Sequence, residues 1–295
     1  MSTSIVNKTA GGVPCLICDA VNSPKAMACQ ECTAPMQFVH DLMAQEREPR
    51  IVTVMGDSNV GKTIYLGFLL DMLSQRANDY EAVPKGAYSV DLQHTVISHM
   101  AYRMFPPKTP VESNEWRWSY YQVRRAEGTS PWVDLIMPDM AGEAIAAEVA
   151  SPSTFRIVRN LLQKSAGALL LIDAAMASNG SPQPDFFGLK MLSYLESMLA
   201  PKRDAQIDTP VAVVLCKADY CPECFDQPRR FVEANLNRMS NMARSRFARV
   251  EYFASSVVGS LAYATSEEDG FVRPIPLHVS LRGVLEPFEW VISQL

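Results

Sequence analysis

The stretch IVTVMGDSNVGKTIYLGFLLDMLSQ (51–75) decides the fold, because it sets a glycine-rich turn between a strand and a helix. Its first residues are mostly β-branched and predict a buried strand, and its proline-free apolar end predicts a helix. Between them, Gly56-x4-Gly61-Lys62-Thr63 is a P-loop, whose glycines let backbone N–H groups and the helix N-terminus surround phosphates. Lys62 is expected to reach the β- and γ-phosphates, and the Thr63 hydroxyl to ligate Mg²⁺.

The residues expected to bind nucleotide through this loop are consecutive: Gly56, Asp57, Ser58, Asn59, Val60, Gly61, Lys62, Thr63 and Ile64. A motif of this kind also arises by chance, but the strand–loop–helix context makes the prediction specific.

The composition limits the class of protein. The chain has 295 residues, 48% of them hydrophobic, which suffices for one large domain or for one domain and a small module. A formal charge of -5 argues against non-specific binding to nucleic acid or to an anionic membrane. The N-terminus lacks the apolar core of a signal peptide, and the most apolar stretch (167–177) is too short to span a bilayer. We therefore expect a soluble cytoplasmic protein, in which reduced cysteines bind metal more often than they form disulfides.

Residues 15–32, CLICDAVNSPKAMACQEC, have the pattern C-x2-C-x10-C-x2-C. Two such knuckles supply four thiolates at the tetrahedral geometry that Zn²⁺ accepts: Cys15, Cys18, Cys29 and Cys32. Four protein ligands leave no open position, so this zinc would be structural and not catalytic. The segment resembles the zinc ribbons of the Ran-binding-protein type, including Asn22, but has Val13 where that family usually has tryptophan. The resemblance implies a protein- or RNA-binding module. The alternative is a structural clip that docks on the main domain.

The chain is expected to fall into three parts. A zinc ribbon occupies residues 1–36, a linker with a short helix follows at 37–49, and an α/β domain extends over 50–295. In the linker, apolar residues at helical spacing would line one face: Met36, Val39, Leu42 and Met43.

Residues 132–145, WVDLIMPDMAGEAI, place an apolar strand before Asp139-x-x-Gly142-Glu143. This resembles switch II of Ras-like GTPases, although an ordinary strand end with a turn is the alternative. The resemblance implies that Asp139 holds Mg²⁺ through water and that the Gly142 amide contacts the γ-phosphate. Ras-like enzymes commonly have a glutamine where this chain has Glu143, and the glutamine orients the attacking water. A carboxylate adds negative charge near the γ-phosphate, so we expect slow intrinsic turnover unless a partner or an arginine assists.

A second strand is predicted upstream. Residues 115–123, EWRWSYYQV, alternate at period two and are expected to form a hairpin with 131–138 through the turn EGTS (127–130). Before it lies an insertion at about 80–105, with a helical pattern from Val90 to Phe105.

The segment PPKTPVE (106–112) supplies the candidate for switch I, where Ras-like GTPases carry a magnesium-binding threonine. Thr109 is the best candidate to complete the Mg²⁺ shell, because Thr95 is too far upstream and Thr129 lies in the predicted hairpin turn. The residues expected to act in catalysis are Lys62, Thr109, Gly142 and Glu143.

Two further apolar runs end in polar motifs, VAVVLCKAD (211–219) and VEYFASS (250–256). They resemble the N-K-x-D and S-A motifs that read guanine in Ras-like GTPases. Asp219 would accept hydrogen bonds from guanine N1–H and the 2-amino group, a pair that adenine cannot offer, and Lys217 would lie along the base and ribose. Ser255-Ser256 takes the place of S-A, with the Ser256 N–H as the donor to O6. Cys216 replaces the usual asparagine, and its weak hydrogen bonding is expected to loosen the coupling to the P-loop.

Cys221 and Cys224 form a third C-x2-C pair, directly after the base-reading motif. A second zinc site would need further ligands, such as His278, to converge on them. We interpret the pair as loop thiols.

Over residues 50–295 these stretches, in this order, resemble TRAFAC-class Ras-like GTPases. The resemblance implies a three-layer α/β domain with a mixed, mainly parallel sheet. The ending GVLEPFEWVI (283–292), the PPKTP segment and the ribbon resemble the bacterial double-GTPase family. That family implies a second GTPase or effector as partner and a role in signalling or in conflict and defence systems. Asn59 resembles the asparagine of GTPases activated by monovalent cations, which implies a bound K⁺.

The sequence therefore predicts a GTP-binding protein that hydrolyses GTP slowly to GDP with Mg²⁺, carries Zn²⁺, and acts as a nucleotide-dependent switch. Three alternatives remain open. The first is a scaffold that holds nucleotide without significant hydrolysis, and the second is an ATPase or nucleotide kinase, against which Asp219 argues. The third is a nucleic-acid binder acting through the ribbon.

Overall fold

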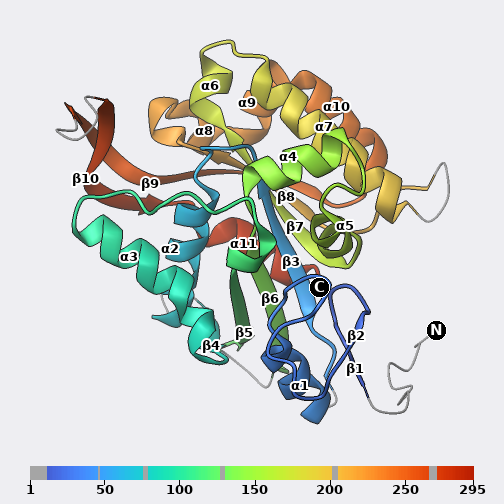
Figure 1. The fold of residues 1–295 in the computed structure, drawn as a ribbon. Helices are drawn as coiled ribbons and strands as arrows, with labels where there is room; N and C mark the ends of the chain where they lie inside the picture. The colour runs from blue at the N-terminus through green and yellow to red at the C-terminus, as the bar shows by residue number, and fades with distance from the viewer. Residues whose placement is uncertain (1–11, 46, 76–78, 127–129, 201–204, 266–270) are drawn as a thin grey trace.

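An eight-stranded sheet forms the centre of the molecule (Figure 1). The computed structural model describes residues 12–45, 47–75, 79–126, 130–200, 205–265 and 271–295. The strand order is β10-β9-β8-β7-β3-β6-β5-β4. Its parallel part consists of β6 (Val133–Asp139), β3 (Arg50–Gly56), β7 (Ser165–Asp173), β8 (Val211–Cys216) and the first residues of β9 (Val250–Thr265). The remaining pairs are antiparallel, so the prediction of a mixed, mainly parallel sheet is confirmed.

Helices cover both faces of the sheet. One face packs against α2 (Lys62–Ser74), α3 (Asp91–Ala101) and α11 (Glu286–Ser293). The other packs against α4 (Gly142–Ala150), α5 (Arg156–Gln163), α7 (Gln183–Leu199), α9 (Pro228–Asn235) and α10 (Asn237–Arg246). Successive side chains of a strand point to opposite faces, so Val52 and Val54 join the first core and Ile51 and Met55 the second. Short helical turns complete the chain: α6 (Ala174–Ser178), α8 (Glu223–Asp226), η1 (Ala87–Val90), η2 (Ser113–Glu115) and η3 (Ala218–Tyr220). No helix among the described residues is long and apolar enough to cross a membrane.

The predicted hairpin is present. Strand β5 (Arg117–Arg125) runs antiparallel to β6, with Arg117 opposite Asp139. The predicted turn falls largely on residues 127–129, which include Thr129 and lie outside the described part of the chain. The insertion begins with a strand that helical periodicity did not predict, β4 (Tyr80–Pro84), which extends the sheet beyond β5. Helix α3 then lies within the segment where a helical pattern was expected.

A long two-stranded arm extends the sheet at its other edge. Strand β9 pairs with β8 only over Val250–Ser255, and its outer half pairs with β10 (Val272–Arg282) alone. Figure 1 shows this arm projecting away from the helical layers. Strand β10 contains two prolines, which an edge strand tolerates because its outward-facing backbone makes no ladder bonds. The sequence predicted only the first residues of this arm.

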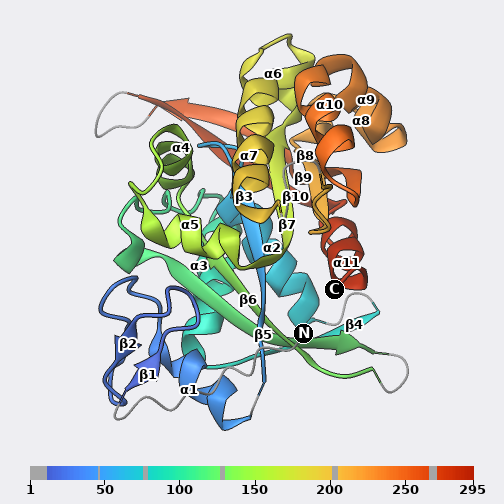
Figure 2. The same ribbon diagram turned by 90° about the vertical axis from the view of Figure 1, so that its right-hand side faces the viewer.

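The ribbon and the linker helix pack onto the end of the β5–β6 pair (Figure 2). The ribbon contains β1 (Val13–Pro14) and β2 (Val21–Asn22), and the linker contains α1 (Met36–Ala44). Phe38 of α1 contacts the Trp118 ring, with 5.9 Å between centroids. Lys164 ties the ribbon to the domain, because its Nζ donates to the Leu16 carbonyl at 3.0 Å. Met43 is 41% exposed and does not belong to the buried face of α1, where Phe38 lies instead.

Candidate nucleotide-binding site

The carboxyl ends of the parallel strands surround a cavity of about 700 Å³. Its lining includes most of the predicted nucleotide-binding residues: Ser58, Asn59, Val60, Gly61, Lys62, Thr63, Ile64, Thr109, Gly142, Glu143, Lys217, Asp219 and Ser255. Four predicted residues are not part of this lining but form hydrogen bonds with residues that are: Gly56, Asp57, Asp139 and Ser256. A cleft at the ends of parallel strands is where open α/β sheets bind their ligands.

The P-loop has the conformation that its glycine spacing predicts. Gly61 has φ 101° and Asn59 φ 63°, both left-handed, so the loop bends sharply before α2 begins at Lys62. The Lys62 ammonium lies inside the loop, where its Nζ donates to the Gly56 and Asp57 carbonyls at 2.9 Å each. Burial lowers the pKa of Lys62, and the nearby Asp139 charge opposes that shift. The loop thus holds a buried cation where the motif expects phosphate.

Three oxygen-bearing side chains from three separate segments meet beside the loop. The Thr109 hydroxyl donates to the Asp139 carboxylate at 2.7 Å and lies 2.9 Å from the Thr63 hydroxyl, which in turn donates to Asp139 at 3.2 Å. Neighbouring ligands of an octahedral Mg²⁺, bound at about 2.1 Å, are about 2.9 Å apart, so the spacing of the Thr63 and Thr109 oxygens suits this ion. Asp139 accepts from both hydroxyls, which is compatible with its holding the ion through water. Burial raises the pKa of Asp139, whereas the Thr109 hydrogen bond lowers it. A buried carboxylate among hydroxyls is a suitable donor set for a hard cation.

The segment after Asp139 lies directly against the P-loop. A Cβ added to Gly142 would be 2.7 Å from Lys62 Nζ and 2.8 Å from the Ser58 backbone nitrogen, so only glycine fits there. Ser58 Oγ donates to the Glu143 carboxylate at 2.6 Å, and Lys108 Nζ lies 3.8 Å from it. The Ser58 hydrogen bond lowers the pKa of Glu143, with a smaller contribution from the Lys108 charge. The carboxylate therefore stays ionised at the phosphate end of the cavity.

The residues that were predicted to read the base meet at another part of the cavity. The Ser256 hydroxyl donates to the Asp219 carboxylate at 2.9 Å, which joins β9 to η3. Lys217 has a left-handed φ of 57°. The buried Ser255 hydroxyl has no hydrogen-bond partner among the described residues, and Ser255 is part of the cavity lining. Burial raises the pKa of the Cys216 thiol to about 12, so it remains neutral at physiological pH.

Several residues of the cavity wall were not predicted from the sequence. They are Phe105, Pro106, Pro107 and Lys108 before Thr109, Asp173, Ala175, Met176 and Asn179 around α6, and Val257, Val258, Leu261, Tyr263 and Pro274 of the arm. A polar residue at the end of a parallel strand is the one available signal, and it would have indicated Asp173. The arm residues belong to no recognisable sequence motif. Their position at the cavity depends on the course of the β9–β10 pair, which local sequence does not indicate.

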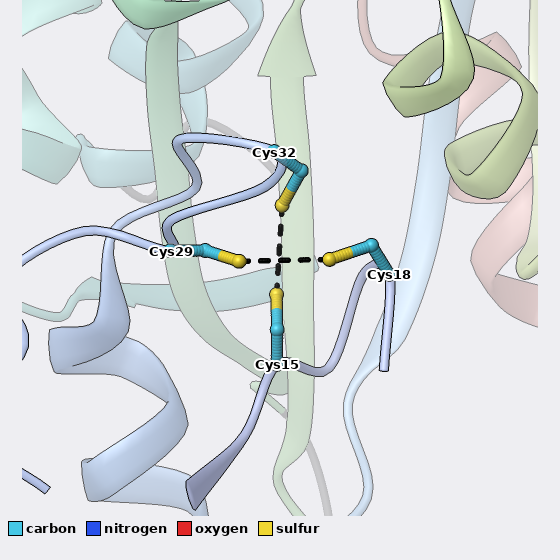
Figure 3. Close-up of side chains that lie close together, drawn as sticks. All are labelled: Cys15, Cys18, Cys29 and Cys32. Carbon is cyan, nitrogen blue, oxygen red and sulfur yellow. Dashed lines mark hydrogen bonds between the residues drawn. The ribbon is translucent and has the colours of Figure 1, made fainter. Parts of the chain in front are cut away.

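The four ribbon cysteines converge on one point (Figure 3). Their sulfurs lie within 4.8 Å of one another, with Cys15 and Cys32 3.6 Å apart and Cys18 and Cys29 3.5 Å apart. A tetrahedral Zn²⁺ with bonds of about 2.3 Å requires sulfurs about 3.8 Å apart, so the cluster fits. The hydrogen bond with Cys32 lowers the pKa of Cys15 to about 5, whereas burial raises that of Cys18 to about 11. Four cysteine sulfurs at this spacing could hold one cation, which would favour their deprotonation and offset the repulsion between the thiolates.

Cys221 and Cys224 form a buried pair with 2.9 Å between their sulfurs. Among the described residues, the ribbon cysteines are the only group of three or more His, Cys, Asp or Glu side chains placed to share a metal ion. The described part of the chain therefore offers no such partners for a second zinc at Cys221 and Cys224.

The fold and the P-loop at the strand ends define a P-loop nucleotide-binding protein of the Ras-like class. A family model described as Double-GTPase 1 matches residues 53–259. Since the match spans more than half of the chain, the protein belongs to the Double-GTPase 1 family. It is therefore a GTP-binding protein of the GTPase class, and the resemblance inferred from its motifs is confirmed.

Solved structures with similar folds are distant in sequence. The Ski7 GTPase-like domain of S. cerevisiae, bound to GDP and inorganic phosphate, is 16% identical with a TM-score of 0.41. The similarity covers 74% of this chain and 45% of that chain, so this protein spans less than half the length of the Ski7 chain. The Arl6 BBS3 small GTPase of Trypanosoma brucei is 14% identical, with a TM-score of 0.41, covering 83% of this chain and 96% of its own. A comparison with curated proteins found no match.

Proposed function

We propose that this protein hydrolyses GTP slowly and acts as a nucleotide-dependent switch towards a protein partner. The observation that supports this most is the meeting of Thr63, Thr109 and Asp139, which come from the start of α2, the segment before β5 and the end of β6 and lie within hydrogen-bonding distance. A γ-phosphate and Mg²⁺ at that point would hold the loops around Thr109 and Gly142 together. Hydrolysis would release them and change the surface that a partner contacts.

The proposed ligands follow the two ends of the cavity. Residues Gly56–Ile64 would hold the phosphates, and Thr63, Thr109 and Asp139 would hold Mg²⁺. Asp219, with Lys217, Ser255 and Ser256, would hold the guanine base. Asn59, which lines the cavity, would bind K⁺ beside the phosphates. The ribbon cysteines would hold Zn²⁺ as a structural ion.

Slow turnover follows from the charge of Glu143. An ionised carboxylate can accept a hydrogen bond from water, but it repels the negative charge of the γ-phosphate. Its hydrogen bond from Ser58 also holds it against the P-loop. Lys62, Thr109, Gly142 and Glu143 are the residues that we propose for catalysis. In the alternative, the same residues only hold nucleotide and the protein is a scaffold without significant hydrolysis.

The partner that we propose is a second GTPase or an effector protein, in line with the family description. We propose a cytoplasmic location. Burial of the ribbon cysteines in the core that also contains Trp116 and Trp118 supports a structural role for the ribbon over nucleic-acid binding.

Nucleotide titration tests the base-reading assignment. Wild type should bind GTP far more tightly than ATP or XTP, and Asp219→Asn should shift the preference towards XTP, because the amide can donate where the carboxylate accepts. Equal affinity for ATP and GTP, unchanged by the substitution, would rule out guanine reading by this loop.

Single-turnover hydrolysis with saturating Mg²⁺, with and without a partner GTPase, separates the switch from the scaffold. A measurable rate that Lys62→Met abolishes supports a GTPase. Tight GTP binding with no hydrolysis in either condition supports the scaffold.

A further inference from the structure

We propose that Asp173 is a positioning residue of the base-reading site, where it holds Lys217 in the orientation that binds nucleotide. This inference rests on the proposed function, because it assigns the control of nucleotide retention at that same site.

Sheet register brings the two residues together. Strands β7 and β8 are parallel, and Asp173 pairs with Cys216 at their carboxyl ends. Lys217, the next residue, turns back through its left-handed backbone. Its Nζ lies 2.5 Å from Asp173 Oδ2, the two side chains being 39% and 11% exposed. Both residues line the nucleotide cavity.

The two oxygens of Asp173 have different partners. While Oδ2 pairs with Lys217, Oδ1 accepts a hydrogen bond from the Met176 N–H at 2.9 Å and caps α6. Helix α6 in turn lines the cavity with Ala175 and Met176. One carboxylate therefore joins the wall formed by α6 to the loop that carries Asp219.

The ion pair between Asp173 and Lys217 is important for holding the loop because Cys216, in the position of the usual asparagine, contributes little. Its thiol is buried and neutral, and a thiol is a weak hydrogen-bonding group. Within the described residues, the side-chain contacts that hold the loop are Lys217 with Asp173 and Ser256 with Asp219. A lysine left free would lose rotamer freedom whenever nucleotide binds. Pairing with Asp173 removes that cost beforehand, so it should slow nucleotide release without changing base preference.

Asp173→Asn separates the two roles of the carboxylate. Asparagine caps a helix as well as aspartate does, so α6 should be retained while the charge pair is lost. We expect GDP carrying a fluorescent ribose label to leave this variant about three- to tenfold faster than wild type. The difference in release rate should become smaller at high salt, because salt screens the ion pair between Asp173 and Lys217 in wild type. GTP preference over XTP should not change.

The effect must also depend on Lys217. In a Lys217→Met background, Asp173→Asn should produce no further acceleration, because the partner is already absent. Glu251→Gln is the control, since it removes a more exposed ion pair with Arg229 whose two residues are not part of the cavity lining, and it should leave nucleotide release unchanged.

Unchanged release in Asp173→Asn, or equal acceleration with and without Lys217, would overturn the proposal. A difference in GDP release rate between wild type and Asp173→Asn that does not change with salt would also contradict the proposal. This salt comparison can still be made if Lys217→Met binds nucleotide too weakly to be measured. Failure of guanine reading would appear separately, as Asp219→Asn keeping its preference between GTP and XTP.

Discussion

The two ends of the nucleotide cavity are built in different ways. At the phosphate end, Lys62 lies within a contiguous loop, and its close neighbours are the Gly56 and Asp57 carbonyls and the glycine at 142. At the base end, the motif departs from the common pattern at Cys216, and the loop is held by contacts from two other strands, through Asp173 and Ser256. We therefore expect the phosphate end to require particular residue types that other side chains cannot replace. We expect the base end to require a loop held in position, which different residues can achieve.

Removal of zinc is expected to have the largest effect on stability and also to change nucleotide binding at the phosphate end of the cavity. The ribbon lies beside the segment after Thr109, where Thr33 faces Ser113 at 3.4 Å and Trp116 donates to the Pro110 carbonyl at 2.9 Å. Chelation, or Cys29→Ser, should lower the free energy of unfolding by about 4 kcal/mol and Tm by about 10 °C, measured by calorimetry. Preference for GTP over GDP with Mg²⁺ should weaken, whereas preference for GTP over XTP should not. A chelator should have no further effect on Cys29→Ser, and an unchanged Tm in wild type would show that the ribbon is not held by metal.

Lys62→Ala should remove contacts to the phosphates and leave the base end of the cavity intact. Loss of the charged hydrogen bonds to two phosphates should weaken GTP binding by about 3 kcal/mol, or at least about 100-fold, in calorimetric titration. Lys108→Ala, at the rim of the cavity, serves as control and should cost far less, because its charge is exposed to solvent. Similar losses in the two variants would mean that Lys62 does not contact phosphate.

Glu143→Gln should increase single-turnover hydrolysis by about tenfold, because it removes a negative charge beside the γ-phosphate and keeps an oxygen that can orient water. The amide oxygen can still accept from Ser58, so the geometry should be retained. GTP affinity measured alongside should change little. A slower variant would indicate that the carboxylate serves as a base, contrary to our interpretation.

The smallest effect concerns the neutral thiol at the base end. Burial raises the pKa of Cys216 from the usual 9.0 of a cysteine to about 12 in the folded protein. The stability that the buried neutral thiol contributes is therefore fully present below pH 9 and is lost as pH rises from 9 towards 12. Wild type should therefore lose about 1 kcal/mol more stability than Cys216→Ala between pH 8 and pH 10 in denaturant unfolding. Parallel pH profiles for the two proteins would show that the thiol ionises freely in the fold.

Local motifs were sufficient to predict a large part of the molecule. The P-loop, the hairpin of β5 and β6 and the cysteine cluster all depend on spacing within a short segment, and each lies where its pattern indicated. Strand β4 and the outer arm were not predicted. In β4 the signal is only two buried alternating residues, Tyr80 and Ala82, and the arm's outer half has mixed exposure with no clear period. The face of α1 was predicted in part, since Phe38 is buried where Met43 was expected.

The sequence by itself determined the α/β class, the loop that surrounds phosphate and the four-cysteine ribbon, because their chemistry requires particular residues at fixed short spacings. Only the tertiary structure decided that Thr109 meets Asp139, that Ser58 bonds to Glu143, and that Asp173 holds Lys217. Each of these pairs joins residues that are 30 to 85 positions apart. Their meeting depends on strand order and register, which bring the carboxyl ends of distant strands to one edge of the sheet.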